Sequence, residues 1–85
     1  MGFVATPEFV ERYLNLDLAS AACVDRAVVR LEAETAAAWA RRNRVVGEQG
    51  AAWIVEVCCP AGTCRLYWDQ PTPEGPLLLL LLLPN

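Results

Sequence analysis

The sequence predicts a small α+β domain in which one strand and two helices precede three further strands. Three observations support this prediction. The first half of the chain carries apolar residues at helical spacing, and the second half is rich in β-branched, aromatic and leucine residues. Pro- and Gly-containing segments separate the apolar runs of the second half. The 85 residues have room for a single domain, residues 1–85.

The first elements are a short strand and a helix. Residues 2–5 form an apolar run that stops at Thr6. Thr6 is a favourable N-cap, and Pro7 suits the first helical position because its missing N–H would have no partner there. Apolar residues then recur on one side of a helix that we expect to end near Asp17: Phe9, Val10, Tyr13 and Leu14.

The second helix is expected to begin after Asp17 or Ser20 and to run to about Ala40. Only a few residues join it to the first helix, so the two should form an antiparallel hairpin. The segment 41–44, Arg-Arg-Asn-Arg, breaks the helical pattern, and the glycines at 47 and 50 indicate a connection.

Two strands, Trp53–Cys59 and Cys64–Asp69, flank a predicted four-residue hairpin loop at residues 60–63. This loop would place Cys59 opposite Cys64. The remaining expected pairs are Val57 with Leu66, Val55 with Trp68, Trp53 with Gln70, Cys58 with Arg65, Glu56 with Tyr67 and Ile54 with Asp69. Side chains alternate along a strand, so one face of the hairpin should be apolar and include the tryptophans.

The other face of this hairpin contains the candidate chemical residues. Arg65 and Tyr67 are two apart on one strand and should point the same way, with Glu56 across from Tyr67. The arginines of the preceding connection could close one edge of this surface: Arg41, Arg42 and Arg44. A guanidinium can hold a phosphate with two hydrogen bonds, and a phenol can stack on a base or exchange a proton. A solvated sheet face without a site is the alternative interpretation.

The final strand is predicted at Leu77–Leu83, after a turn at residues 71–76. Its seven consecutive leucines are far short of the roughly 20 apolar residues of a membrane-spanning helix. A strand of leucines is apolar on both faces. We therefore expect it to lie in the middle of the sheet or to be covered by a partner.

Charge and composition limit the available chemistry. The net charge is −3, from ten acidic residues and seven arginines, and the chain contains no Lys or His. Neither an imidazole nor an amine side chain can therefore act as an acid or base, which leaves carboxylates, tyrosines, cysteines and arginines. The first residues do not show the pattern of a secretory signal, so a cytoplasmic protein without a membrane contact is expected.

The four cysteines do not predict a metal site. They include no Cys-x-x-Cys pair, and zinc would need all four thiolates, Cys23 on a helix among them. Cys59 and Cys64 could form a disulfide under oxidising conditions, whereas small buried apolar residues are the preferred interpretation. We expect no metal and no cofactor.

Several segments together resemble the RelE/ParE superfamily of bacterial toxin–antitoxin modules. They are the opening Thr-Pro-Glu-Phe-Val-Glu-Arg-Tyr-Leu, the Arg-rich segment 42–47, Trp-Ile-Val-Glu-Val at 53–57, Cys-Arg-Leu-Tyr-Trp at 64–68 and the last aliphatic strand. The resemblance implies a small antiparallel-rich sheet with the helical hairpin on one face and the other face open. RelE-type members cleave mRNA in the ribosomal A site, and ParE-type members inhibit DNA gyrase.

The resemblance also implies roles for individual residues. Arg65 matches the arginine of the family's third-strand motif, and Tyr67 occupies its aromatic position. Arg42 and Arg44, in the same segment as Arg41, match basic residues that grip the RNA backbone. Metal-free cleavage would use arginines to stabilise charge on the phosphoryl oxygens, with Tyr67 or Glu56 as proton carriers.

Two functions from different classes follow, and both include a cognate antitoxin as partner. The first is a ribosome-dependent mRNA endonuclease that contacts the ribosome and mRNA without DNA contact of its own. The second is a non-catalytic, ParE-like or degenerate module that binds a protein, because the net negative charge opposes contact with RNA. A third interpretation is an unrelated small α+β domain without activity.

Overall fold

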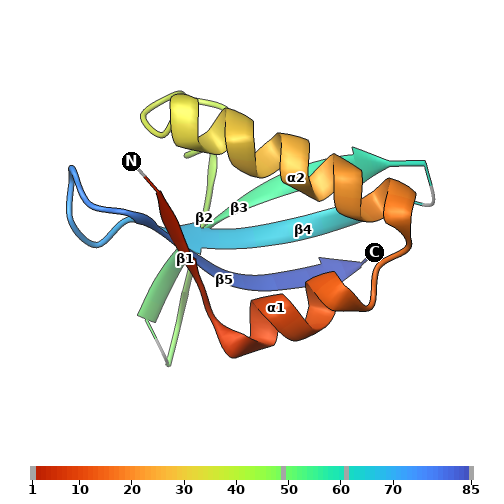
Figure 1. Ribbon diagram of the computed structural model, residues 1–85. Coiled ribbons are helices and arrows are strands. Elements are labelled where there is room, and N and C mark those ends of the chain that lie inside the picture. The colour runs from red at the N-terminus through yellow and green to blue at the C-terminus, as the bar shows by residue number, and fades with distance from the viewer. Residues whose placement is uncertain (1, 49, 61, 85) are drawn as a thin grey trace.

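The computed structural model describes residues 2–48, 50–60 and 62–84, and it is an α+β domain of five strands and two helices (Figure 1). In chain order the elements are β1 (Phe3–Ala5), α1 (Pro7–Leu14), α2 (Leu18–Ala33), β2 (Asn43–Gly47), β3 (Gly50–Cys59), β4 (Gly62–Asp69) and β5 (Leu77–Pro84). The predicted α+β class and the order of its first elements are confirmed.

The five strands form one mixed sheet in the order β1-β5-β4-β3-β2. β1 pairs with β5 in parallel, and the other neighbours are antiparallel. Both helices lie in front of the sheet in the view of Figure 1, which leaves the opposite side of the sheet without a helix. We call that side the open face.

The core lies between the helices and the sheet. Its buried apolar side chains come from every element except β1 and β2: Phe9 of α1; Cys23, Val24, Val28 and Leu31 of α2; Val55 and Val57 of β3; Cys64, Leu66 and Trp68 of β4; and Leu77, Leu79 and Leu82 of β5. Ala40, in the connection after α2, is also buried. Alternate positions of β3 and β4 therefore point toward the helices, as the alternation along the sequence predicts.

The leucine strand β5 lies between β1 and β4, which confirms a central position in the sheet. A register shift opposite Tyr67 and Trp68 pairs them with Leu81 and Leu79, leaving Leu80 as an extra residue. This bulge lets Leu79 and Leu82, three residues apart, both face the helices. Among the described residues, no helix is long and apolar enough to cross a membrane.

The β3–β4 hairpin differs from the prediction in its register. Cys59 pairs with Gly62 and Val57 with Cys64, so residues 60 and 61 alone separate the strands; Ala61 lies outside the described residues. Gly62 has φ +138°, a backbone conformation that favours glycine. The predicted register is wrong by two positions. Because side chains alternate with a period of two, every side chain still lies on its predicted face.

The second helix ends at Ala33, seven residues before the predicted end at Ala40. The carboxylate of Glu34 accepts a hydrogen bond from Trp39 Nε1 at 3.0 Å and pairs with Arg30 at 3.3 Å. The following turns bring the carbonyl oxygen of Ala40 to within 3.3 Å of Trp68 Nε1. A helix continued through the alanines would lose the contacts of Trp39 with Glu34 and of Ala40 with Trp68, so tertiary packing overrides helix propensity here.

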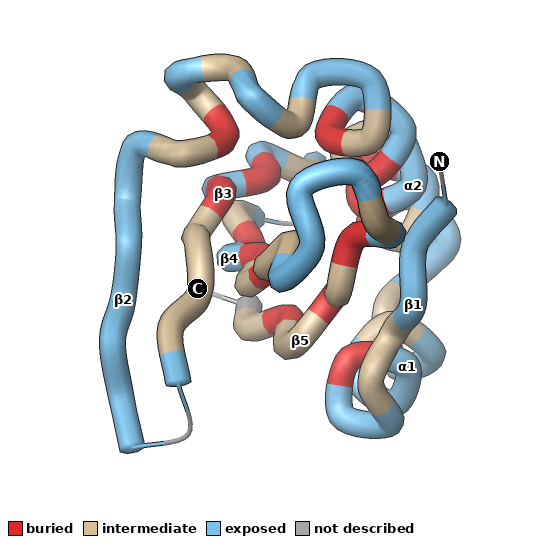
Figure 2. The backbone as a smooth tube through the Cα atoms, turned by 90° about the vertical axis from the view of Figure 1, so that its left-hand side faces the viewer, coloured by how far each residue is buried: buried red, intermediate tan, exposed pale blue. Residues whose placement is uncertain are grey.

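β2 is a strand where the sequence predicted only a connection. Val45 and Val46 lie on it, and it pairs with β3 from Asn43 opposite Ile54 to Gly47 opposite Gly50. All its residues are exposed, and Figure 2 shows it at one edge of the molecule. The observed order is therefore β-α-α-β-β-β-β. A strand with both faces in water lacks the apolar alternation by which strands are recognised.

The two helices run antiparallel but do not pack closely on each other. α1 packs on β5, whereas α2 packs on β3. The predicted antiparallel arrangement of the two helices is confirmed (Figure 1). The space between the two helices forms a groove.

We expect Thr6→Ala to lower the free energy of unfolding by about 1 kcal/mol. Thr6 Oγ1 accepts a hydrogen bond from the backbone N–H of Phe9 at 3.2 Å and donates one to the carbonyl of Leu80 at 2.7 Å. It therefore caps α1 and ties it to β5. Urea unfolding measures the loss. Thr72→Ala, in an exposed turn, is the matched control, and an equal loss in the two variants would contradict this role.

Candidate functional site on the open face

Arg65 and Tyr67 emerge together on the open face. They alternate along β4 with Cys64, Leu66 and Trp68, which are buried beneath the helices. Arg65 is exposed and Tyr67 is half-buried. The prediction that these two side chains share the uncovered side of the sheet is therefore confirmed.

Glu56 also lies on the open face, but the register places it opposite Arg65 and not opposite Tyr67. Ile54 takes the position across from Tyr67. The described residues contain no ion pair between Glu56 and Arg65, although they are cross-strand partners. A guanidinium, a carboxylate and a phenol are thus brought within two strand positions of one another, with the charged groups accessible to water.

The surroundings of these groups are apolar. On β5, Leu83 lies opposite Arg65 and Leu81 lies opposite Tyr67. Next to Tyr67 is a hollow of about 690 Å³, bordered by the start of α1 and the free end of the β2–β3 hairpin. Its lining residues are Thr6, Glu8, Val45, Gly47, Glu48, Gly50, Ala51, Ala52, Tyr67, Leu80 and Leu81. The bulge explains how consecutive leucines 80 and 81 both line this hollow.

Acidic groups outnumber basic ones on the open face. Of its described strand positions, Arg65 carries a positive charge, and Glu56 and Asp69 carry negative charges. Glu8 and Glu48 add two carboxylates at the border of the hollow. This distribution repels a phosphate backbone at all positions except the immediate surroundings of Arg65.

Arg41 lies on the opposite side of the sheet, with the tryptophans. Its guanidinium is 5.2 Å from the ring centre of Trp68 and 5.4 Å from that of Trp53. Its Nε donates to the carbonyl of Thr35 at 2.6 Å, and its Nη2 donates to Gln70 Oε1 at 3.2 Å. Cation–π contacts and hydrogen bonds thus make Arg41 a structural residue.

Arg44 also belongs to the tryptophan side. It is the β2 partner of Trp53, and its guanidinium lies 4.4 Å from the Trp53 ring centre. Arg42 is exposed in the turn before β2. The expectation that Arg41, Arg42 and Arg44 close one edge of the Arg65 surface is therefore wrong for Arg41 and Arg44, because their guanidinium groups stack on aromatic rings of the other face.

Three of the four cysteines meet at one end of the core, and all four are free thiols. The Cys59 thiol on β3 has Cys23 of α2 and Cys64 of β4 as neighbours, and its Sγ lies 3.9 Å from the carbonyl oxygen of Ser20 and 3.8 Å from that of Val57. Burial and these two neighbours raise the pKa of Cys59 to about 12. The described residues contain no cluster of potential metal ligands. The preferred interpretation, small buried residues, fits these thiols. Cys58, in contrast, is exposed on the open face.

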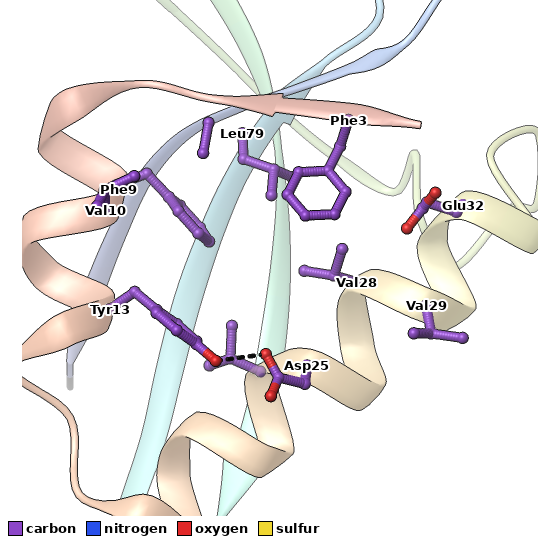
Figure 3. A pocket seen from close by; sticks show the side chains of 11 residues that line it. Phe3, Phe9, Val10, Tyr13, Asp25, Val28, Val29, Glu32 and Leu79 are labelled. Atoms are coloured by element: carbon purple, nitrogen blue, oxygen red, sulfur yellow. Dashed lines mark hydrogen bonds between the residues drawn. The ribbon is translucent and has the colours of Figure 1, made fainter. Parts of the chain in front are cut away.

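A second hollow, the helix groove, lies between α1 and α2 on the covered side of the sheet (Figure 3). It measures about 360 Å³ and is almost wholly apolar: its lining residues are Phe3, Ala5, Phe9, Val10, Tyr13, Val24, Asp25, Val28, Val29, Glu32 and Leu79. Tyr13 Oη donates a hydrogen bond to Asp25 Oδ1 at 2.6 Å across it. Sequence reasoning missed this groove; its signal was a second row of apolar residues along α2.

We expect Arg41→Ala to lower the free energy of unfolding by about 2 kcal/mol, because it removes two hydrogen bonds and the cation–π contacts with both tryptophans. Arg42→Ala is the matched control and should change it by less than about 0.5 kcal/mol. Urea unfolding followed by tryptophan fluorescence measures both. Equal changes in the free energy of unfolding for the two variants would contradict a structural role of Arg41 that Arg42 does not share.

The Tyr13–Asp25 hydrogen bond predicts a loss of stability at high pH. The hydrogen bond to Asp25, burial and the nearby carboxylate charge raise the pKa of Tyr13 above its ordinary value of 10.0. The unfolded chain therefore loses this proton first, so the contribution of Tyr13 is complete below pH 10.0 and declines as the pH rises. The difference in unfolding free energy between the parent chain and Tyr13→Phe should therefore shrink as the pH rises above about 10. A constant difference would contradict the hydrogen bond.

Comparison with known proteins gives no relative from which a role could be transferred. No family model, curated protein or solved structure matches the chain. The arrangement of side chains on the two surfaces is therefore the basis for any functional conclusion.

Proposed function

We propose that the chain is a non-catalytic interaction module of the RelE/ParE type, and that its open face binds proteins. The partners would be a cognate antitoxin and, when the antitoxin is absent, a protein target such as gyrase. The family part of this proposal is supported by the sequence resemblance. The protein-binding part is supported by the surface of the sheet.

The observation that carries the proposal is the apolar character of the open face. Antiparallel strands with one solvated face normally alternate apolar and polar residues. Here, Leu81 and Leu83 face the uncovered side next to Tyr67, and Ile54 and Leu80 extend the same surface. Contiguous apolar surface of this kind is typical of protein-binding sites in soluble domains.

Charge favours a protein over RNA as the ligand. The open face carries one arginine among several carboxylates, and two of the arginines that the sequence suggested for RNA stack on tryptophans of the other side. An acidic surface slows and weakens association with a polyanion. A protein partner with a basic border around an apolar centre would complement it.

Metal-independent mRNA cleavage is the second candidate function, and one specific observation favours it. Arg65, Tyr67 and Glu56 share the uncovered face, and no ion pair with another described residue occupies Arg65. In such a reaction the 2′-hydroxyl attacks the adjacent phosphate. Arg65 would stabilise the negative charge on the phosphoryl oxygens, while Tyr67 or Glu56 would carry a proton. This chemistry requires no cofactor.

Inducing the chain in a bacterial host, with primer extension on a reporter mRNA, tests both functions. The interaction module predicts growth arrest without cuts in the mRNA. Leu81→Asp should abolish the arrest because it places a charge in the centre of the apolar surface. Arg65→Ala should leave the arrest largely intact.

Controls separate the outcomes. Val46→Asp introduces the same charge at a residue that is 78% exposed on the other side of the sheet, and it should still arrest growth. Circular dichroism of each purified variant verifies folding. Cuts at codon boundaries that disappear in Arg65→Ala would contradict the non-catalytic proposal and support the nuclease. The absence of any arrest would refute both functions.

A further inference from the structure

The helix α2 carries apolar residues on two sides. One row is buried in the core and includes Val24, Val28 and Leu31. A second row, spaced by four and three residues, consists of the apolar residues Leu18, Ala22 and Val29 and the carboxylates Asp25 and Glu32. Asp25, Val29 and Glu32 line the helix groove, and Leu18 and Ala22 continue the row toward the start of α2. Its two large apolar members are strongly exposed, Leu18 at 90% and Val29 at 66%. A helix that packs only on its own sheet needs a single apolar face, so exposed apolar residues on a second side indicate a further contact.

The facing wall of the groove is also apolar. Val10 and Leu14 lie one turn apart on α1 and are 41% and 74% exposed, and Phe3 of β1 is 49% exposed. Figure 3 shows Phe3, Val10 and Val29 around the groove, with Val28 between the helices. Leu14 and Leu18, at the ends of the two helices, lengthen the apolar walls beyond the groove itself.

The length of this surface indicates the kind of ligand. From Leu18 to Glu32 there are 14 residue steps, which at about 1.5 Å each give about 21 Å of helix. A row of this length, with apolar residues and two carboxylates along it, is longer than a small molecule needs. It matches a helix laid along the groove, a common mode of peptide recognition.

The charge of the groove indicates the chemistry of that helix. Asp25 and Glu32, seven residues apart, place two carboxylates on its α2 wall. The neighbouring cations are engaged elsewhere: Arg26 Nη2 contacts Cys23 Sγ at 3.2 Å, and Arg30 pairs with Glu34 at 3.3 Å. Among the described residues, neither groove carboxylate forms an ion pair, and Asp25 accepts the hydrogen bond from Tyr13 Oη at 2.6 Å.

We propose that the helix groove binds an amphipathic basic helix of a partner protein, about fourteen residues long, whose apolar side chains pack between Val10 and Val29 and whose Arg or Lys residues meet Asp25 and Glu32. A second copy of this chain does not fit that description, because α2 would bring its own carboxylates into the groove. The groove lies on the side of the sheet opposite the open face. This proposal is therefore independent of the proposed function.

Two synthetic fifteen-residue, alanine-based helical peptides test the proposal. Both carry Leu at two-turn spacing on one face. The basic peptide has Arg at two flanking positions seven residues apart, and the acidic peptide has Glu there. Fluorescence anisotropy with labelled peptides should give at least about tenfold tighter binding of the basic peptide. Added salt should reduce this preference, because it screens charges at the rim. Equal affinities, or no binding of the basic peptide, would overturn the proposal.

Variants of the chain locate the binding. The double variant Asp25→Asn, Glu32→Gln should weaken the basic peptide about three- to tenfold and remove its salt dependence. Val29→Asp should abolish binding. Glu74→Gln, which removes one carboxylate from an exposed turn, is the control that should bind like the parent chain. Circular dichroism checks that each variant folds.

Amide chemical shifts upon peptide addition complete the test. Shifts that change along α1 and α2 support the proposal. Changes confined to β3 and β4 would overturn the groove as the binding site and leave the proposed function of the open face unaffected.

Discussion

The structure depends on the contact between Trp53 and Trp68 and the two arginines that lie on them. The tryptophans are cross-strand partners on β3 and β4, and Trp68 is completely buried with its Nε1 hydrogen-bonded to Ala40. Arg41 and Arg44 stack on this pair from the connection and from β2. Because strand side chains alternate, burying these rings fixes the opposite orientation for Arg65 and Tyr67. The same contact places both guanidinium groups on the side of the sheet away from Arg65 and Tyr67.

The sheet consequently has two apolar faces, of which only one is covered by the chain itself. The chain's own helices cover one face. The other keeps leucines of β5 and the Tyr67 ring in contact with water. A run of seven leucines cannot make one face of a strand polar, so any fold that places it centrally leaves an apolar surface for a partner. The acidic residues around that surface favour a partner with a basic border and disfavour a polyanion, so we favour protein binding over RNA cleavage.

The sequence was sufficient for the elements with strong periodicity. The N-cap at Thr6 and the apolar face of the β3–β4 hairpin were predicted from local patterns. The central position of the leucine strand was one of the two alternatives that its composition allowed. The register of the β3–β4 hairpin was not predicted correctly, because Gly62 belongs to the strand and not to the loop. The early end of α2 depends on contacts with Trp68, far away in the sequence, which no local propensity encodes.

The strand β2 was missed because it is exposed on both faces. Two valines before Gly47, with Gly50 three residues later, were the available hairpin signal. The face of the sheet was predicted correctly for Arg65 and Tyr67, where alternation alone decides it, and wrongly for Arg41 and Arg44, whose orientation depends on aromatic partners in other strands.

The most direct test of this account is an NMR measurement of where the arginine side chains lie. The side-chain protons of Arg41 and Arg44 should show NOEs to the indole rings and upfield ring-current shifts that are lost for Arg44 in Trp53→Leu. Arg65 should show NOEs to Leu83 and none to either tryptophan. Unshifted Arg44 protons together with NOEs between Arg44 and Tyr67 would place the arginines on the open face and contradict the account.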